Sequence, residues 1–451
     1  MSVNLQSIGM SGIAAAEAAM AVVESNITNA SNPNYSVESM GFATTMGANG
    51  GGNGVAILGT TRAESPLLTN QINTTQSTQS YDQSFSQVST VAQQIVTPST
   101  GDLSSTLQNV FNAMSALSSQ PQDATTRTSV LTALQQFAQT DQNISSGLYS
   151  TALTQLNSVG PVVTQINAAA SQIAQLNAQI TSAAASGQSV APLLDQRDGA
   201  INQLASLIGA TADSNGNVTV GGVPLVSGAS ALKLSTTGSG TSIGLSVALA
   251  NGSLPLNLSQ VGGQLGGIMS GAQATLNLQT QVDGFARSMA TSLNNLATTG
   301  WGLDGTTGNA LFTMSAAGGP ISIDPGLTVQ NLPAASTAAG VPGDGSNASA
   351  MAALASNTNL FPTYPNNTPV EVLTQITSNF GTLVQNATDG QTQAANTLQS
   401  LNQMKSAITG VSINQQLVQL LQLQNLLQAS GRAVQAANDN LTFLIQNIAG
   451  S

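Results

Sequence analysis

The sequence predicts a mainly α-helical chain with a smaller β part, elongated and divided into several domains. Apolar residues at both ends follow the alternating three- and four-residue steps of a coiled-coil seam, which predicts a terminal α-helical coiled coil formed by both chain ends. The same spacing recurs between residues 69 and 208 and indicates a central helical bundle. Residues 210–260 instead alternate apolar and polar residues after an Asn-Gly turn, which indicates an outer β-rich region.

The longest seam lies between Val411 and Gly450. Its positions step four and three residues without a slip: Ile413, Leu417, Leu420, Gln424, Leu427, Gly431, Val434, Asn438, Leu441, Ile445 and Ile448. A helix with one apolar stripe is not stable alone in water, so this helix needs a partner. The three positions that are not aliphatic, Gln424, Gly431 and Asn438, recur every seven residues. We interpret them as register markers or points of close helix approach.

A matching seam lies within residues 3–30, at Ile13, Ala16, Met20, Val23 and Ile27. We expect residues 1–62, a coiled-coil helix and a following loop, to pair with residues 409–451. We also expect both ends to pair with neighbouring subunits. The alternative is that each end caps a separate core. The N-terminal stretch has no positively charged region before its apolar residues and is not interpreted as a secretory signal peptide.

The middle of the chain divides by hydrophobic period and composition. We expect a helical bundle at 63–209, a β-rich segment at 210–260, a bundle helix at 261–300, a loop and strand outer region at 301–369, and two returning bundle helices at 370–408. The glycine-rich tract at 47–54 lacks the lysine and hydroxyl residue of a phosphate-binding loop and is expected to be a flexible loop.

Composition excludes several classes of function. Charged residues make up 6% of the chain, against roughly 25% in typical domains, and the net charge is −11. With no basic patch, nucleic acid and anionic lipid are poor partners. Cysteine and histidine are both absent, which removes thiolate metal sites and the commonest general base. No cofactor or metal is expected, and no apolar run is long enough to predict a membrane span.

One cluster of charged residues could have a catalytic role. Asp195 and Asp198 flank Arg197 at the start of a predicted helix, and paired carboxylates could serve acid–base chemistry in a wall hydrolase. Helix N-terminal charge with local pairing is the commoner meaning of such a cluster. No other titratable group lies nearby in sequence, and three of the five glutamates lie in or beside the N-terminal helical region. We therefore predict no enzymatic activity and no catalytic residue.

Several stretches, in chain order, resemble one group of proteins. Residues 5–13 (LQSIGMSGI) and 25–36 (SNITNASNPNYS) resemble the opening of flagellar rod, hook and hook-associated proteins, in which a helix leads to an Ala-Asn stretch and a Thr-Pro-Gly-Tyr turn. Asn34 stands where those proteins usually have glycine. The departure is mild, because asparagine is the next-best residue for a positive φ.

Further segments narrow the resemblance to the flagellar hook-associated protein 1 family, the hook–filament junction proteins. Two parts of the chain resemble segments characteristic of that family. The first is residues 173–180 together with 193–198 (LLDQRD), and the second is residues 300–312. Ala297 replaces a histidine usual before the second segment. Residues 410–448 resemble the family's terminal helix, with Asn-Gln-Gln at 414–416 in place of the usual acidic run.

The resemblance implies a structural role in the bacterial flagellum, at the junction between hook and filament. It implies export through the flagellar type III apparatus without a cleaved signal peptide, an extracellular location, and self-association into a ring or tubular layer. It also implies contacts with the hook protein and an adjacent junction protein, and an export chaperone on the C-terminal helix. The alternative within the same class is a hook, rod or second junction component.

The residues that we expect to form the assembly and chaperone interface belong to the two seams. They are Ile13, Met20, Val23, Ile27, Leu417, Leu420, Leu427, Val434, Leu441, Ile445 and Ile448.

Overall fold

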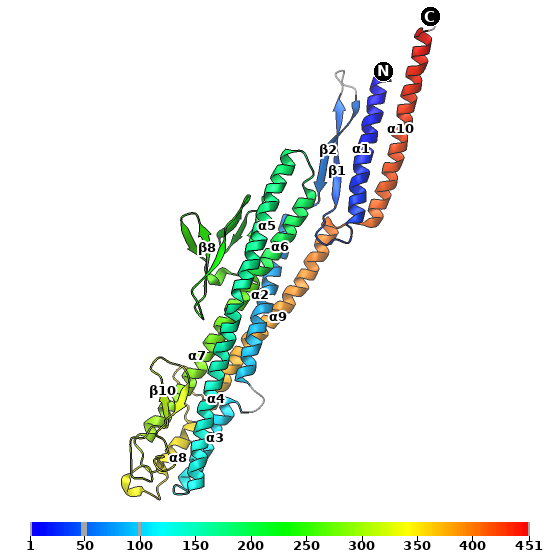
Figure 1. The fold of residues 1–451 in the computed structure, drawn as a ribbon. Helices are drawn as coiled ribbons and strands as arrows, with labels where there is room; N and C mark the ends of the chain where they lie inside the picture. Colours follow the sequence, from blue (N-terminus) through cyan, green and yellow to red (C-terminus); the bar gives the residue numbers. More distant parts are fainter. Residues whose placement is uncertain (1, 47–51, 98–100, 450–451) are drawn as a thin grey trace.

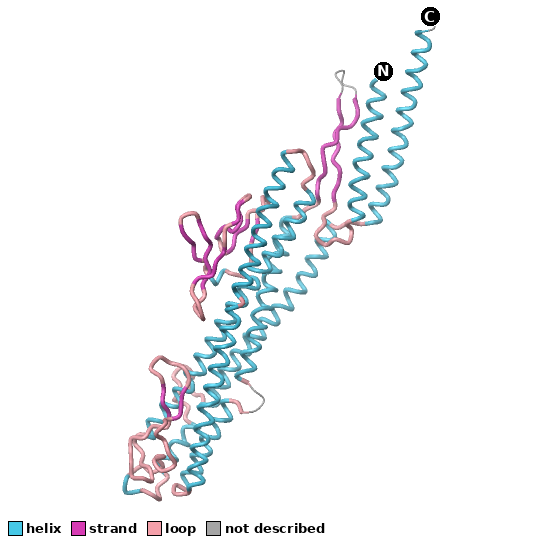
Figure 2. Tube along the Cα trace, in the orientation of Figure 1, coloured by secondary structure: helices cyan, strands magenta, loops and turns pink. Residues whose placement is uncertain are grey.

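The chain folds into a long rod of helices with small sheets attached to its side (Figures 1 and 2). The computed structural model describes residues 2–46, 52–97 and 101–449. Both chain ends lie at the same tip of the rod, and the middle of the sequence forms the opposite tip. The prediction of a mainly α fold with a smaller β part is confirmed.

The tip with the two chain ends is a terminal unit of two helices and one hairpin. Helix α1 (Ser2–Thr28) lies between the antiparallel hairpin β1 (Glu38–Met46) and β2 (Gly52–Arg62) on one side and helix α10 (Ile413–Ala449) on the other (Figure 1). The expectation of a loop after the first helix was wrong, because residues on both sides of the glycine-rich tract pair as strands. Residues 47–51 of that tract lie outside the described residues, and Gly52–Gly54 begin β2.

The body of the rod is a bundle of long helices. They are α2 (Pro66–Val96), α3 (Leu103–Ser119), α4 (Ala124–Asn157), α5 (Val159–Ala185), α6 (Ala191–Ile208), α7 (Gly263–Ala297) and α9 (Pro369–Thr409). Asp102 and Asp123 begin α3 and α4 as N-caps, each accepting a backbone N–H three residues on. Helix α9 is continuous, so the prediction of two returning helices was wrong. Its polar middle lacks an apolar stripe, yet Gly390 lets α9 approach Asp82 of α2 closely.

Two small sheets lie beside α5, α6 and α7. The first contains β3 (Thr211–Ala212), β4 (Val218–Val220), β5 (Val223–Ser227) and β6 (Ser230–Ala231), and the second contains β7 (Leu234–Thr237), β8 (Gly244–Leu249) and β9 (Gly252–Pro255). A one-turn helix, η1 (Leu258–Gln260), returns the chain to α7. Buried aliphatic residues of α5 and α6 form one core with these strands. The β-rich segment predicted at 210–260 matches these strands.

The far tip of the rod holds the remaining short elements. They are β10 (Phe312–Met314), β11 (Ile321–Ile323), η2 (Ala338–Gly340), α8 (Ser346–Ala353) and η3 (Leu354–Ser356). A second core joins this tip to α3, α4, α7 and the start of α9, with Phe137 and Phe312 packed edge to face. Arg127, 1% exposed, donates to the backbone oxygens of Pro121 and Val329 and thereby ties the tip to α4.

Helix α1 also meets the length and hydropathy of a membrane span. The stretch Gln6–Thr28 has a mean hydropathy of 1.3 over its most apolar window. The sequence showed no such span because Glu17 and Glu24 interrupt the apolar run. In the structure this stretch packs against α10 and the hairpin, so its apolar composition has a use within the terminal unit.

Candidate assembly surfaces

Helices α1 and α10 run antiparallel and meet along a line with heptad spacing. On α1 the residues that face α10 are small: Gly9, Gly12, Ala16, Ala19, Val23 and Asn26, all buried except the half-buried Gly12. On α10 five of the eight residues at matching steps are Leu or Val, and the line is formed by Gln416, Leu420, Leu423, Leu427, Ser430, Val434, Ala437 and Leu441. Small residues on one helix and aliphatic ones on the other let the two backbones approach closely.

The closest approach lies near the N-terminus of α1. A Cβ placed on Gly9 would lie 2.5 Å from Cγ2 of Val434, and one on Gly12 would lie 2.8 Å from Oγ of Ser430. A methyl group on Gly9 would overlap with the branched side chain of Val434, so Gly9 is required by contact rather than by backbone angle, whereas one on Gly12 would need the hydroxyl of Ser430 to turn away. Gly431 of α10 has open space around it within 4 Å. The interpretation of Gly431 as a point of close approach was wrong within this chain.

The other end of the contact is polar and buried. Nδ2 of Asn26 donates to Oε1 of Gln416 at 3.0 Å and to the backbone oxygen of Glu38 at 2.9 Å. Oδ1 of Asn26 accepts from the hydroxyl of Tyr35 and from the backbone N–H of Glu38. One side chain, 1% exposed, therefore fastens α1, the turn after it, β1 and α10 to each other.

The structure divides the predicted interface residues into two groups. Val23 is buried and Leu420, Leu427, Val434 and Leu441 are half-buried on the α1–α10 contact line. The others flank that line. Ile13, Met20 and Ile27 are half-buried, while Leu417 and Ile445 are 46% and 62% exposed. The side chain of Ile448 lies outside the described residues.

The register of the C-terminal seam differs from the predicted one. The positions shared with the prediction are Leu420, Leu427, Val434 and Leu441. The alternate positions are one residue earlier than predicted, at Leu423, Ser430 and Ala437, and the predicted Gln424 and Asn438 are exposed. The stripe on α10 is wide enough for both registers, and the partner helix selects one of them.

The hairpin exposes its larger side chains. Ala43 and Ala56 form a cross-strand pair that is half-buried, and Gly54 lies against Ser11 of α1. On the opposite face, the cross-strand pair Phe42 and Ile57 is 43% and 44% exposed. Leu58 falls at a register shift between the strands and is 69% exposed, and Met46 is 79% exposed. This face of the hairpin is apolar and uncovered within the chain.

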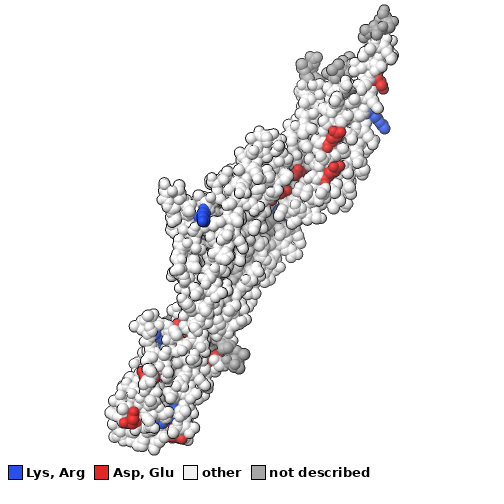
Figure 3. All heavy atoms as spheres, in the orientation of Figure 1, with Lys and Arg blue, Asp and Glu red and all other residues white. Residues whose placement is uncertain are grey.

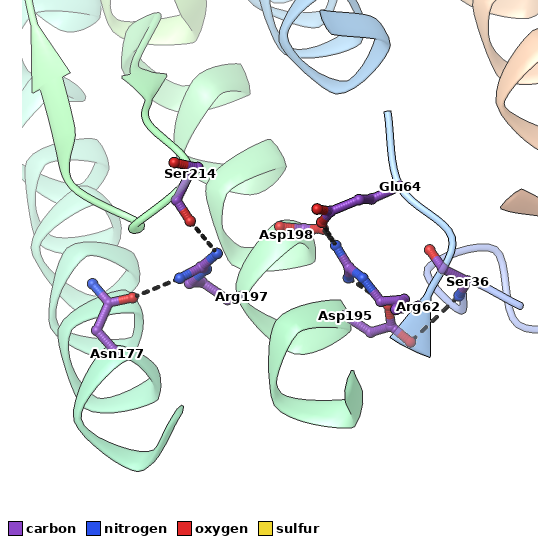
Figure 4. Close-up of polar contacts among 8 residues, drawn as sticks. All are labelled: Ser36, Arg62, Glu64, Asn177, Asp195, Arg197, Asp198 and Ser214. Atoms are coloured by element: carbon purple, nitrogen blue, oxygen red, sulfur yellow. Dashed lines mark hydrogen bonds and ion pairs between the residues drawn. The ribbon is translucent and has the colours of Figure 1, made fainter. Parts of the chain in front are cut away.

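An ion cluster joins the terminal unit to the helical body (Figure 4). Arg62, at the end of β2, donates to Oδ1 of Asp195 and to Oδ2 of Asp198, both at 2.7 Å, and lies 3.5 Å from Glu64. The backbone N–H of Ser36 also donates to Asp195 at 3.4 Å. Because Asp195 and Asp198 are one turn apart on α6, a single guanidinium spans both.

The predicted local pairing with Arg197 was wrong. Arg197 points to the other side of α6, where it donates to the backbone oxygen of Ser214 at 3.0 Å and to Oδ1 of Asn177 (Figure 4). Burial raises the pKa of Asp195 from its usual value, while the bond from Arg62 opposes the rise. The guanidinium of Arg62 binds one oxygen of each carboxylate, so both aspartates have a structural partner in the joint.

The surface carries few charges, and they are scattered over the face in view (Figure 3). Arg62, Arg127 and Arg197 are buried or paired inside the molecule. Among the described residues, no group of three or more acidic, His or Cys side chains could hold a metal ion. The terminal unit exposes the charged side chains of Glu17, Glu24, Arg432 and Asp439 beside the apolar side chains of α10 and the hairpin.

Comparison with known proteins gives matches to one kind of protein. The family described as "Flagellar hook-associated protein FlgK helical domain" matches residues 86–312. Flagellar hook-associated protein 1 of Salmonella typhimurium is 30% identical over 331 residues, which are 68% of this chain and 59% of that protein. The Escherichia coli protein of the same name is 28% identical over 329 residues, with the same shares.

A solved structure is also similar. The flagellar hook junction protein FlgK from Burkholderia pseudomallei matches with a TM-score of 0.50 and 27% sequence identity, over 55% of this chain and 47% of that chain. The match to the curated relatives spans 59% of their length, or about three fifths. The resemblance seen in the sequence motifs is confirmed by these matches.

Proposed function

Because the chain belongs to the FlgK family of flagellar hook-associated proteins, we propose that it is a structural component of the junction between hook and filament. The observation that carries this proposal is the terminal unit. It pairs both chain ends and still leaves apolar side chains of α10 exposed, among them Leu417, Leu421 and Phe443. Exposed apolar residues in one segment mark a surface that another chain covers.

We propose that assembly proceeds through this unit, by self-association into a ring or tubular layer that contacts the hook protein and an adjacent junction protein. Short polar side chains dominate the surface, so copies can pack with little charge to desolvate. The seam residues of α1 and α10 that flank the internal contact line are the candidates for these contacts between subunits.

The same proposal includes export by the flagellar type III apparatus without a cleaved signal peptide. It also includes an extracellular location in the flagellum. A chaperone on the C-terminal helix would cover apolar side chains before assembly. The exposure of Ile413, Leu417 and Leu421 at the start of α10, and of Phe443 and Ile445 near its end, supports such a role for this helix.

We infer that the chain acts as a structural element and not as an enzyme. The relatives that it matches are hook-associated proteins. The only carboxylate pair that the sequence offered for catalysis, Asp195 and Asp198, is engaged by Arg62 in the joint between terminal unit and body.

The test replaces Leu427 and Val434 by aspartate. Both lie on the α1–α10 contact line, so two charges there should separate the helices and abolish both junction assembly and chaperone binding. A matched control places aspartate at the exposed Gln428 and Gln435, one residue further on, where assembly should be better retained. Labelling of sheared hooks and filaments locates the protein, and circular dichroism checks that the body stays folded. Motile cells with normal filaments on the Leu427 and Val434 variant would contradict the proposal.

A further inference from the structure

Two buried aspartates lie beside strand β11, in the part of the rod opposite the terminal unit. Asp141 of α4 is 0% exposed and Asp283 of α7 is 6% exposed. Oδ2 of Asp141 accepts from the N–H of Ile321 at 2.8 Å, and Oδ2 of Asp283 accepts from the hydroxyl of Ser145 at 3.0 Å. Oδ1 of each aspartate is buried and has no hydrogen-bond partner among the described residues. A buried carboxylate oxygen without a donor is costly when the group is ionised.

The two carboxylates are close to each other across the contact between α4 and α7. Ser145 follows Asp141 by about one turn of α4, and its hydroxyl accepts from Nε2 of Gln279 on α7 at 3.0 Å while it donates to Asp283. The charge of Asp283 adds to the rise in the pKa of Asp141. When two carboxylates share a buried site, one of them keeps its proton to a higher pH than usual.

One cation lies near the pair. Helix α7 contains Asp283 and Arg287 as its only charged residues, and Arg287 follows Asp283 by about one turn. Neither aspartate forms an ion pair with another described residue. On α4 itself, Arg127 lies roughly four turns before Asp141 and donates to backbone oxygens, while Tyr149 lies about two turns after it and is 44% exposed.

The other elements around α4 bring no further charge to the site. Helices α3 and α5 and strands β10 and β11 contain no charged residue. Helix α2 has Tyr81 and Asp82, which lie more than three turns, or roughly 20 Å, before Ile95, where α2 packs against α4. Asp324, directly after β11, is half-buried and accepts from the N–H of Gly326. Arg287 is therefore the only nearby group that can neutralise the pair when both aspartates are ionised.

Strand β11 covers Asp141 like a lid. Ile321 is buried and bonded to Asp141, whereas Ser322 and residues 315–318 of the preceding turn are exposed. Three attachments hold the hairpin to the helices. Besides the bond to Asp141, Nε2 of Gln142 donates to the oxygen of Ile321 at 2.8 Å, and Nη1 of Arg287 donates to the oxygen of Gly319 at 3.5 Å. Because β10 and β11 have three residues each, the hairpin depends on such attachments to stay in place.

We propose that Asp141 and Asp283 share one proton in the folded chain, and that loss of this proton loosens the β10–β11 hairpin from α4 and α7. The proton is bound at one of the two Oδ1 atoms, which have no other partner. When both groups are ionised, two negative charges lie in a buried site, and water reaches them if β11 lifts. Arg287 then has carboxylates to pair with and is drawn away from the oxygen of Gly319. The pair thus makes the shape of the far tip depend on pH.

The sign of the effect follows from the two states of the carboxyl. Burial, the largest cause, raises the pKa of Asp141 to about 7 and also raises the pKa of Asp283. A carboxyl exposed by a lifted hairpin returns to a pKa near ~3.9. Lifting therefore releases a proton between about pH 4 and pH 7. The lifted population should rise by up to about tenfold per pH unit in this window and level off above it.

Amide hydrogen exchange of the purified full-length chain tests the proposal. Protection factors, corrected for the intrinsic exchange rate at each pH, are measured from about pH 5 to about pH 8 in the presence of a chelator. Residues 312–323 report the hairpin, and residues 211–231 of the first small sheet serve as the internal reference. We expect protection of the hairpin to fall by up to about tenfold per pH unit and to level off near pH 7, while the reference stays constant.

Three variants and one control separate the shared proton from a general loss of stability. Asp141→Asn keeps an acceptor for Ile321 and cannot ionise, so hairpin protection should no longer depend on pH. Asp283→Asn removes the neighbouring charge, so the fall should end at a lower pH. Arg287→Met removes the cation that favours ionisation, so the fall should continue to a higher pH. Asp389→Asn, at an exposed site on α9, should leave the profile of the wild-type chain unchanged.

Three outcomes would overturn the proposal. The first is the same pH profile in the wild-type chain and in Asp141→Asn. The second is a uniform loss of protection along α4 and α7 together with the hairpin. The third is a hairpin that the chelator loosens at pH 5 and that added Ca²⁺ restores, since a cation would then occupy the site. If Asp141→Asn fails to fold by circular dichroism, the opposite shifts expected for Asp283→Asn and Arg287→Met decide. The proposed function does not depend on any of these results, because they concern the isolated chain.

Discussion

Asn26 and Gln416 lie 390 positions apart in the chain, and their side-chain amides are 3.0 Å apart in a buried site. Gln416 is 6% exposed although it is the fourth residue of an otherwise exposed helix start. This pair fixes where α10 begins relative to the end of α1. That position sets which residues of α10 lie on the α1–α10 contact line.

The first prediction concerns this amide pair. Asn26→Ala would remove the bonds that Asn26 makes to Gln416 and to both backbone groups of Glu38, and would leave the hydroxyl of Tyr35 with only its 3.4 Å contact to Ser25. We expect a loss of about 1–3 kcal/mol in the stability of the terminal unit. Faster amide exchange at the start of α10 would report it. Asn29→Ala is the control, because the Asn29 side chain, just beyond the end of α1, donates only to the backbone oxygen of Ser25 among the bonds described for it. Equal exchange in both variants would contradict the prediction.

The second prediction compares two glycines of the helix pair. Gly9→Ala should cost about 1–3 kcal/mol, because the new methyl group meets Val434, and Val434→Ala should recover part of the loss. Gly431→Ala should instead stabilise α10 by about 0.5–1 kcal/mol, since that site is open and alanine favours helix. Thermal unfolding of the terminal unit measures both. If Gly9→Ala and Gly431→Ala changed the stability equally, Gly9 would not lie in close contact with Val434.

The third prediction concerns the ion cluster. Arg62→Met should destabilise the joint by about 3–5 kcal/mol, because Asp195 would then be buried without its cation. Adding Asp195→Asn and Asp198→Asn should recover much of the loss. Chemical denaturation measures the series, with the exposed Arg432→Ala as a control expected to change stability by less than about 0.5 kcal/mol. If Arg62→Met left the stability unchanged, the ion cluster would not stabilise the joint.

The fourth prediction is a dependence of stability on pH. Burial raises the pKa of Asp141 to about 7, and the nearby Asp283 adds to the rise, while the N–H of Ile321 and the charge of Arg287 oppose it. The unfolded carboxyl has a pKa near ~3.9. Between pH 4 and pH 7 the folded state therefore holds a proton that the unfolded state has released.

The free energy of unfolding should consequently fall as pH rises through that window, by up to ~4 kcal/mol from this group. Asp141→Asn retains an oxygen that can accept from Ile321 and cannot ionise, so its stability should vary less with pH. Urea denaturation of both proteins at several pH values gives the two slopes. Parallel slopes would rule out this carboxyl as the cause.

The fifth prediction concerns the end of α10. Beyond Leu441 this helix extends past the start of α1, and Phe443, Leu444 and Ile445 are 65%, 47% and 62% exposed (Figure 1). We expect fast amide exchange there in the isolated chain, extending into both termini, with slow exchange in the body. Protection should appear on assembly. Slow exchange throughout both termini of the isolated chain would contradict this.

Hydrophobic period predicted the helices whose apolar stripes repeat over several turns, but it divided α9 in two because the middle of that helix is polar. It was not sufficient for the register of α10. Leu420, Leu427, Val434 and Leu441 fit either register, and the contact with the small residues of α1 places Leu423 rather than Gln424 between them. The hairpin was missed because its strands are interrupted by glycine and a register shift near Gly41, which breaks the period of two.

The partner of Asp195 and Asp198 could not be predicted either. Arg62 is 133 and 136 positions away in the chain, whereas Arg197 lies between the two carboxylates. On a helix, residues next to each other in sequence point in different directions, and this rule could have argued against Arg197. The same rule could not have identified Arg62 as the partner, because that contact depends on where the end of β2 lies relative to α6.

The chain passes between terminal unit and body twice, from β2 to α2 and from α9 to α10. The turn after α1 also reaches this joint, where the N–H of Val37 donates to the oxygen of Thr409 at 2.7 Å, and Arg62 fastens the end of β2 to α6. A single peptide linker would let the two parts swivel. Two braced passages must shear together before the parts can rotate about the long axis, so torque on the helix pair is transmitted to the body along both.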